Sequence, residues 1–299
     1  MAALQSMDPI EGLDFDSVSA GDDAYAVQAT SPLCLLLVSK IEHAASSGNL
    51  VAAKEAFTTL SRTDVGSGWL RRPGSALILA LHGNHAKVIE YLLAEGVQIG
   101  PSHVRLATVK RARAILELFV RYGWDLNTQT EWSVPPALAF AAEDFDLCSW
   151  FLDHGADPNA GCVLDITPLS AAVQYGLLEV IQLFFEHGGK VTQGQLLHYA
   201  IWRERDDRAE VVAYLLHKGA PVNLLMYETQ PKSFALQKAF GLGTPLHDAA
   251  AQGDGVVMKL LLDHGADATV HDSLGFLPYQ RAEANGHQAV ARHLHRLVP

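Results

Sequence analysis

Cysteine is scarce in this chain of 299 residues, and long apolar runs are missing. The three cysteines, Cys34, Cys148 and Cys162, show neither the spacing of a metal site nor a disulfide framework. Reduced thiols of this kind fit the cytosol or the nucleus. The apolar run 32–38 is too short for a transmembrane helix, and residues 1–16 carry acids without the basic n-region of a signal peptide. We therefore expect a cytoplasmic or nuclear protein that has no membrane segment.

Basic residues are also in deficit. The chain has 22 Lys and Arg against 33 Asp and Glu, a net charge of −11 and a pI near 5.6, which argues against general nucleic-acid binding. Residues 1–33 contain six acids and no Lys or Arg, which is typical of a disordered extension that either keeps a protein soluble or binds a partner. One basic cluster predicts a solvated helix face or a site for an anionic partner, which the acidic extension itself could be: Arg105, Lys110, Arg111, Arg113 and Arg121.

Recognised catalytic motifs are missing as well. The sequence has no Gly-rich phosphate loop, no Gly-x-Ser-x-Gly and no Cys/His catalytic signature. Its 14 histidines include no His-x-x-x-His with a partnering acid, so we expect neither a metal site nor a cofactor. Acid–base catalysis needs only a positioned donor and acceptor, however, so an enzyme without a known motif stays open.

A repeated motif dominates what is present. Thr244-Pro245-Leu246-His247-Asp248-Ala249-Ala250 leads to an apolar segment that ends at Gly265, and Thr167-Pro168-Leu169 leads in the same way to Gly188. In both copies the closing Gly lies 21 residues after the Thr. Weaker copies bring the total to eight, spaced on average by about 34 residues. Their first residues are Ser39, Ser75, Ser102, Val134, Thr167, Gln195, Thr244 and Leu277.

The chemistry of the motif predicts a pair of helices in each copy. Thr caps the free N–H groups of the first helix, and Pro stands where its missing N–H costs nothing. The closing Gly supplies a left-handed cap for the second helix. An Ala five residues after each first residue lets adjacent helices approach closely: Ala44, Ala80, Ala107, Ala139, Ala172, Ala200, Ala249 and Ala282.

These residues resemble ankyrin repeats, and the resemblance covers residues 39–298. It implies an all-α solenoid of about eight helix–turn–helix units joined by short β-fingers into a curved array. His198 and His247 fall in the slot whose ring commonly bonds the backbone of the neighbouring finger. We expect an acidic extension at 1–33 and a repeat domain at 34–299, whose apolar run at 32–38 belongs to a capping helix. An insertion at 224–243 separates the sixth and seventh units.

The resemblance also implies a binding module, because ankyrin proteins usually bind a protein partner through the fingers and the inner helices. Large aromatic side chains at these positions are typical anchors of an interface. Packing of the aromatic rings under the insertion is the alternative interpretation. The expected binding residues are Trp132, Tyr175, Trp202, Arg203, Tyr227 and Phe276.

A second hypothesis belongs to another class. The insertion could roof an aromatic groove and enclose an apolar small molecule, which the protein would bind or transform. We weigh this below the interaction module, since a fold alone does not decide function. The acid–base candidates would be His82, Glu131, Glu143, Asp165, Tyr175 and Arg203.

Overall fold

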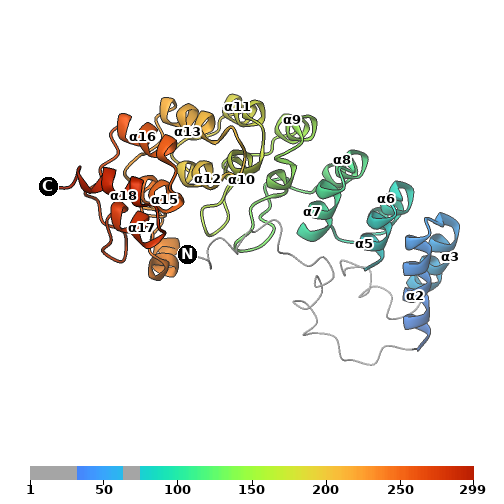
Figure 1. Cartoon of the computed structure of the whole chain (residues 1–299). Coiled ribbons are helices and arrows are strands. Elements are labelled where there is room, and N and C mark those ends of the chain that lie inside the picture. Colours follow the sequence, from blue (N-terminus) through green and yellow to red (C-terminus); the bar gives the residue numbers. More distant parts are fainter. Residues whose placement is uncertain (1–31, 63–74) are drawn as a thin grey trace. The chain divides into compact units, whose positions relative to one another are not determined.

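The computed structural model describes residues 32–62 and 75–299 (Figure 1). The expected acidic extension therefore lies almost wholly outside the described residues. These residues divide into two compact units, which meet in sequence between Thr130 and Glu131. Throughout both described ranges the regular elements are helices, apart from an isolated β-bridge between Glu131 and Val134. The fold is thus all-α, as the repeat pattern predicts.

The N-terminal unit (32–62 and 75–130) contains three helix pairs, each made of an inner and an outer helix. The apolar run at 32–38 begins the first inner helix, so the expected capping helix is continuous with the first repeat. The inner helices pack in chain order, α2 on α5 and α5 on α7. The pairs are α2 (Pro32–Ser46) with α3 (Leu50–Ser61), α5 (Ser75–His82) with α6 (Ala86–Ala94), and α7 (Pro101–Val109) with α8 (Arg113–Arg121).

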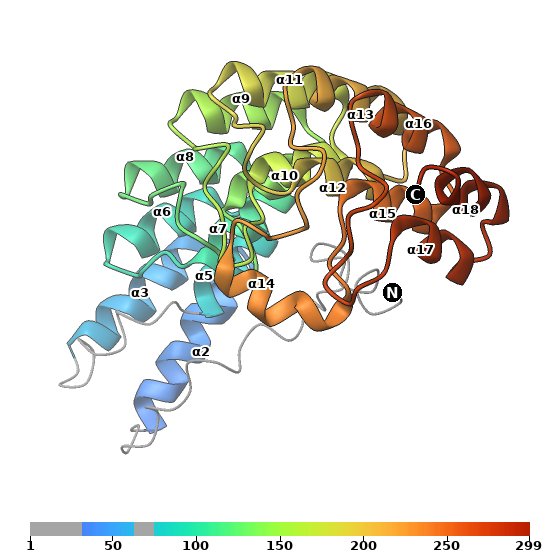
Figure 2. The same ribbon diagram turned by 90° about the vertical axis from the view of Figure 1, so that its left-hand side faces the viewer.

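The C-terminal unit (131–299) contains five further pairs, which makes the expected eight within the described residues. Figure 2 shows its inner and outer helices as two neighbouring rows. The pairs are η3 (Ala137–Ala141) with α9 (Phe145–Asp153), α10 (Pro168–Tyr175) with α11 (Leu178–Glu186), α12 (Leu196–Trp202) with α13 (Arg208–His217), α15 (Pro245–Gln252) with α16 (Gly255–Asp263), and α17 (Pro278–Ala284) with α18 (Gln288–His295).

The small residues of the motif lie where the packing needs them. All eight motif alanines are buried, so each inner helix offers a flat face to the next. Gly188 and Gly265 have φ values of +89° and +87°, the left-handed conformation that ends an outer helix. Thr167 caps α10 through Ser170, whose N–H donates to the Thr167 hydroxyl over 3.1 Å. In the repeat from Thr167 to Gly188, the local chemistry of the motif therefore sets both ends of the helix pair.

Asparagine side chains connect successive units beneath the outer helices. Asn159 donates to the carbonyl of Gly188 over 3.0 Å and accepts from the N–H of Lys190 over 2.7 Å. Asn223 makes the same two bonds further along, to the carbonyl of Gly265 and the N–H of Asp267, at 2.9 and 2.8 Å. Each amide thus satisfies a donor and an acceptor of the following repeat.

Three marks of the sequence-based register miss the observed helix starts, and one expected histidine bond is different. The first inner helix begins at Pro32, well before Ser39, and the fourth begins at Ala137 behind a Pro136 N-cap, after Val134. The third inner helix begins at Pro101 behind a Gly100 N-cap, ahead of the expected Ser102. His247 bonds the carbonyl of Phe276 in the next finger at 3.0 Å, as expected, but His198 bonds the carboxylate of Asp248 at 2.7 Å instead.

None of the helices described is both long and apolar enough to cross a bilayer.

Candidate functional site

The insertion folds onto the C-terminal unit with a hydrophobic core of its own. It contains α14 (Pro231–Gln237) and the short η4 (Lys238–Phe240), and the N–H of Met226 donates to the carbonyl of Gly243 over 2.9 Å to close its base. The core consists of buried Met226, Tyr227 and Leu242, with Trp202 and Phe234 packed against it. Figure 2 shows α14 apart from both rows of helices. The insertion is therefore a packed element and not a loose loop.

A polar relay attaches the base of the insertion to two repeats. The side-chain amide of Gln195 donates to Asp165 over 2.7 Å and accepts from the N–H of Tyr227 over 3.0 Å. All three residues have positive φ, between 54° and 62°, a strained conformation that surrounding contacts must hold in place. Burial raises the pKa of Asp165, although bonds from Gln195 and Gly194 oppose the rise. Burial likewise raises the pKa of Tyr227 and of Tyr199, which share a hydrogen bond.

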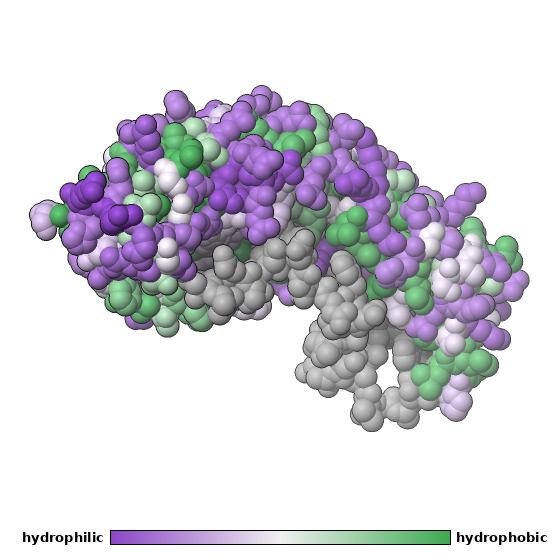
Figure 3. All heavy atoms as spheres, viewed as in Figure 1, coloured by the Kyte–Doolittle hydropathy of each residue, from purple (hydrophilic) through white to green (hydrophobic). Residues whose placement is uncertain are grey.

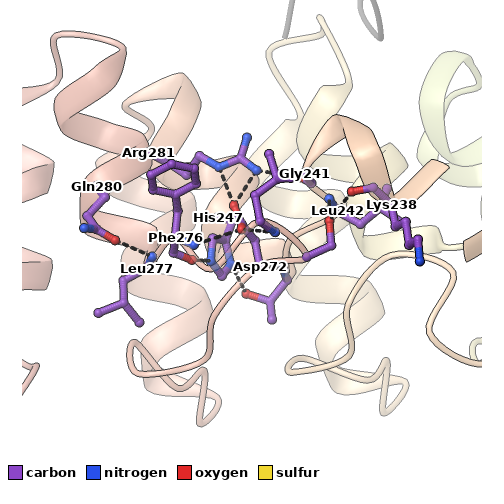
Figure 4. A network of polar contacts seen from close by, with 12 residues as sticks. Lys238, Gly241, Leu242, His247, Asp272, Phe276, Leu277, Gln280 and Arg281 are labelled. Atoms are coloured by element: carbon purple, nitrogen blue, oxygen red, sulfur yellow. Dashed lines mark hydrogen bonds and ion pairs between the residues drawn. The ribbon is translucent and has the colours of Figure 1, made fainter. Parts of the chain in front are cut away.

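A second network fixes the C-terminal end of the insertion to the last finger, which lies in the loop 264–277 between α16 and α17 (Figure 4). The buried carboxylate of Asp272 accepts from the N–H groups of Leu274 and Phe276 at 2.8 and 3.0 Å, and from Nε of Arg281 at 2.7 Å. The Arg281 guanidinium also donates to the carbonyl of Gly241 at 2.6 Å. Burial alone would raise the pKa of Asp272, but bonds from Phe276, Arg281 and Leu274 outweigh it and hold the pKa below its usual value.

Exposed apolar side chains gather along this insertion and the adjoining fingers. We call them the insertion rim. Figure 3 shows hydrophobic side chains at the surface along the lower left margin, where Figure 1 places the orange insertion. Six large exposed side chains make up the rim: Trp132, Val163, Leu236, Phe240, Leu274 and Phe276.

Hydrogen bonds to backbone carbonyls connect the fingers and the insertion along the rim. The N–H of Val163 donates to the carbonyl of Trp132 over 2.9 Å, and Ser233 of α14 donates to the carbonyl of Val163 over 2.8 Å. At the other end Ser273 donates to the carbonyl of Lys238 over 2.6 Å. A methyl group of Leu274 lies about 3.1 Å from where a side chain on Gly241 would begin. The rim therefore rests on a connected scaffold of fingers and insertion.

The structure keeps two of the six expected binding residues on the surface. Trp132 and Phe276 are exposed and belong to the rim. Tyr175 and Trp202 are only half-buried, and Trp202 packs edge-on against Tyr199, with ring centroids 5.5 Å apart. For Trp202, packing against the core of the insertion is the interpretation that holds.

The expected exposure of Arg203 and Tyr227 is wrong, because both are buried. Arg203 bonds both carboxylate oxygens of Asp207, at 2.6 and 2.5 Å, and the carbonyl of Val173 at 2.9 Å. Its guanidinium therefore closes the long turn 203–207 and does not face a partner. Sequence reasoning also missed Val163, Leu236 and Leu274. The spacing of four between Leu236 and Phe240 is the one signal that would have marked a shared helical face.

The acid–base candidates differ in the unit that carries them and in their burial. His82 is exposed and belongs to the N-terminal unit, whereas the other five belong to the C-terminal unit. Glu131 and Glu143 are both exposed. The cavity at the base of the insertion, lined by Gln195, His198 and Leu225 among others, has a volume of only about 30 Å³, room for about two water molecules. This cavity cannot hold the proposed apolar ligand.

The described residues contain neither a cluster of metal-binding side chains nor an activated thiol. Within 32–62 and 75–299, no three His, Cys, Asp or Glu side chains are gathered as a metal site requires. All three cysteines are buried. Burial raises the pKa of Cys148 to about 12, with Asp144 adding to the rise, and it also raises the pKa of Cys162. These two thiols are therefore protonated at neutral pH.

Comparison with known proteins places the repeat motif in a family. A model of ankyrin repeats (three copies) matches residues 137–226, and an ankyrin-repeat model matches residues 243–273. The matched segments cover the fourth to seventh helix pairs, including the base of the insertion.

Similar curated proteins share only part of their length with this chain. Human diacylglycerol kinase iota is 31% identical over 130 residues, which are 42% of this chain and 11% of the kinase. Palmitoyltransferase ZDHHC13 of Mus musculus is 34% identical over 110 residues, 35% of this chain and 15% of that enzyme. Potassium channel AKT1 of Arabidopsis thaliana is 24% identical over 192 residues, 52% of this chain and 21% of the channel. The chain thus spans less than a quarter of each relative.

Proposed function

Because the chain is an ankyrin-repeat protein, and such repeats are generally protein–protein interaction modules, we propose that it binds a protein partner through the insertion rim. The similarity to the kinase and the acyltransferase is confined to the repeat region, so neither activity is carried over. The acidic charge balance of the sequence favours a protein over a nucleic acid as the partner. The reduced thiols favour a cytoplasmic or nuclear location.

The exposure of the rim on a fixed scaffold is the observation that supports this proposal. Trp132 leaves 58% of its surface in water, and each rim residue leaves at least 46% exposed. A group of large apolar side chains on one surface is costly in water and marks an interaction site. Aromatic anchors held by a rigid backbone lose little entropy on binding, which makes them effective hot spots.

The proposal revises the expected docking surface. Trp132 and Phe276 remain anchors, while Val163, Leu236, Phe240 and Leu274 replace the buried residues Arg203 and Tyr227 and the half-buried Tyr175 and Trp202. The partner would therefore lie across the fingers and α14. No specific observation favours the enzymatic hypothesis over this one.

Substitution of rim residues tests the proposal. Trp132→Ala and Phe240→Ala should each weaken binding of a captured partner by about 2 kcal/mol or more, roughly 30-fold in Kd. Both rings are exposed, so the free energy of unfolding, measured by thermal melting, should change by no more than about 0.5 kcal/mol. Trp202→Ala should instead destabilise the protein, because its ring packs against the core of the insertion.

Valine offers a matched control for the same experiment. Val163 lies in the rim and is 47% exposed, whereas Val256 lies in α16 outside the rim and is 64% exposed. Val163→Asp should abolish capture, and Val256→Asp should leave it intact. Equal effects of the two substitutions, or normal binding by Trp132→Ala and Phe240→Ala, would reject the rim as the binding surface.

A further inference from the structure

The turns between inner and outer helices carry opposite charges in the two units. In the N-terminal unit, the α5–α6 and α7–α8 turns, with the first turns of α6 and α8, contain four cations and no acid. We call these four residues, Lys87, Lys110, Arg111 and Arg113, the basic edge. All four are exposed. The basic edge lies outside the unit that carries the insertion rim.

Hydrogen bonds place the turns of the N-terminal unit side by side. The His85 ring contacts the carbonyl of Ser46, in the first turn, through Nε2 at 3.1 Å. The ammonium of Lys110, in the third turn, donates to the carbonyl of His82, in the second, at 3.3 Å. The three turns therefore form one continuous border, and their charges add along it.

The corresponding turns of the C-terminal unit carry an excess of acids, nine against Arg203, Arg205 and Arg208, although the α17–α18 turn contains no acid. Acids in the first turn of an outer helix favour the helix dipole, whereas Lys87 and Arg113 stand there against it. Helix stability therefore does not account for the cations of the basic edge. The acids of the C-terminal turns are Glu143, Asp144, Asp146, Glu179, Glu204, Asp206, Asp207, Glu210 and Asp254.

Neighbouring carboxylates neutralise only part of the basic edge. Arg113 pairs with Glu117 at 3.2 Å, but both side chains are about half exposed, so the pair is weak. Lys87 and Lys110 have no carboxylate within ion-pair distance among the described residues. The border thus retains a positive charge on a chain whose net charge is −11.

We propose that the basic edge binds the acidic segment 8–23 of the same chain. This segment contains six acids and no Lys or Arg, so its charge complements that of the edge. Its acids are interleaved with apolar residues, Ile10, Leu13 and Phe15, which could rest on exposed Val109 beside the edge. The segment would thereby neutralise the basic edge.

The length of the intervening chain suits this arrangement. Helix α2 has 15 residues and runs about 22 Å from Pro32 to Ser46, which is at the border of turns. Residues 24–31 can span about 26 Å when extended, enough to return along α2 to that border. Exposed charge pairs attract weakly, but a short tether raises the local concentration of the segment to the millimolar range. Salt should disrupt the contact, because exposed charges are screened beyond the Debye length.

Zero-length crosslinking of the full chain tests this proposal. A carbodiimide joins a carboxylate to a lysine amine only when the two touch, and mass spectrometry then identifies the residues. We expect amide bonds from Asp14, Asp16, Asp22 or Asp23 to Lys87 and Lys110, and their loss in about 0.5 M NaCl. The exposed lysines Lys218 and Lys259 of the C-terminal unit serve as internal references.

Charge-removing variants provide the matched comparison. Lys110→Gln, Arg111→Gln and Arg113→Gln together should abolish the crosslinks to Lys87, which the variant retains. The control combines Lys190→Gln, Lys218→Gln and Lys259→Gln and should leave them unchanged. Circular dichroism checks that each variant folds, and single substitutions replace any triple variant that does not.

Several outcomes would overturn the proposal. Crosslinks spread evenly over all lysines, insensitive to salt or unchanged in the basic-edge variant, would remove the basic edge as the docking site. Crosslinks between isotope-labelled and unlabelled copies would show an intermolecular contact instead. Salt-sensitive binding of a labelled DNA duplex or of phosphatidylserine vesicles, without crosslinks from the segment, would assign the edge to those anions. None of these results bears on the insertion rim, which belongs to the other unit.

Discussion

Removal of the Asp272 carboxylate should destabilise the last finger and the insertion together. Asp272→Ala deletes the acceptor of the Leu274 and Phe276 N–H groups and leaves the Arg281 guanidinium unpaired. The Asp272 side chain is fully buried, and that of Arg281 is only 12% exposed. Breaking a buried pair by removing one partner costs about 3–5 kcal/mol, because an uncompensated charge stays behind.

The loss should remain local, since each unit of a repeat stack contacts only its neighbours. Amide hydrogen exchange measures this directly. Protection in α17 and α18 should fall by about a hundredfold to several thousandfold, the equivalent of 3–5 kcal/mol, while α10 and α11 keep theirs. Asp263→Ala, at the exposed end of α16, is the control and should have little effect.

A double variant separates the ion pair from simple loss of packing. Replacing Arg281 by Met in the Asp272→Ala background removes the unpaired charge and should restore part of the protection. Two results would refute the reasoning: an effect of Asp272→Ala no larger than that of the control, or a loss spread evenly over all five helix pairs of the unit.

The pH dependence of the same variant gives an independent check. The pKa of Asp272 is lower in the folded protein than the usual 3.8, so its contribution to stability is fully present above that value. The contribution is lost as the pH falls through the folded pKa. The difference between wild type and Asp272→Ala should therefore be constant from pH 5 to pH 8 and shrink below about pH 3.8.

Two further predictions concern the packing between repeats. Burial lowers the pKa of His103 from 6.5 to about 4, so the N-terminal unit should lose about 3 kcal/mol of stability as the pH falls from 6.5 to 4. Urea unfolding at several pH values should show this loss in the wild type but not in His103→Asn, and identical slopes would contradict it. Asn159→Ala removes two hydrogen bonds to the next repeat and should cost about 1–3 kcal/mol. Asn223→Ala should cost a similar amount, and thermal melts of the double variant should show additive losses, because the two amides contact different repeats.

The sequence was sufficient for the helix pairs because their determinants are local. An Ala that must be buried and a Gly that must adopt positive φ are visible as residue types at fixed spacing. The third unit shows the limit of this reasoning. The sequence pattern places the start of this unit at Ser102, two residues after the true N-cap. Gly100 is the N-cap in place of Thr, and Pro101 follows it. The Gly-Pro pair was the local signal for the true start.

The binding site was harder to predict because it depends on tertiary contacts. Spacing from the register placed Arg203 on the surface, but α12 ends at Trp202 and the chain turns the guanidinium inward to Asp207. An Arg and an Asp four residues apart were a visible hint of that pair. Whether the ring of Trp202 would lie open or under the insertion depended on the path of a segment with no repeat pattern.

The insertion changes which surface of the repeats faces a partner. It packs its own core against the inner-helix ring of Trp202 and leaves Leu236 of α14 and Phe240 of η4 exposed. Hydrogen bonds connect α14 and η4 to the fingers that carry Val163 and Phe276, so several repeats hold the exposed side chains of the insertion in position. The affinity of a partner on the rim would therefore depend on how these repeats are packed together. Because the Asp272 carboxylate holds the backbone N–H groups of Leu274 and Phe276, its removal should also weaken partner binding by releasing Phe276.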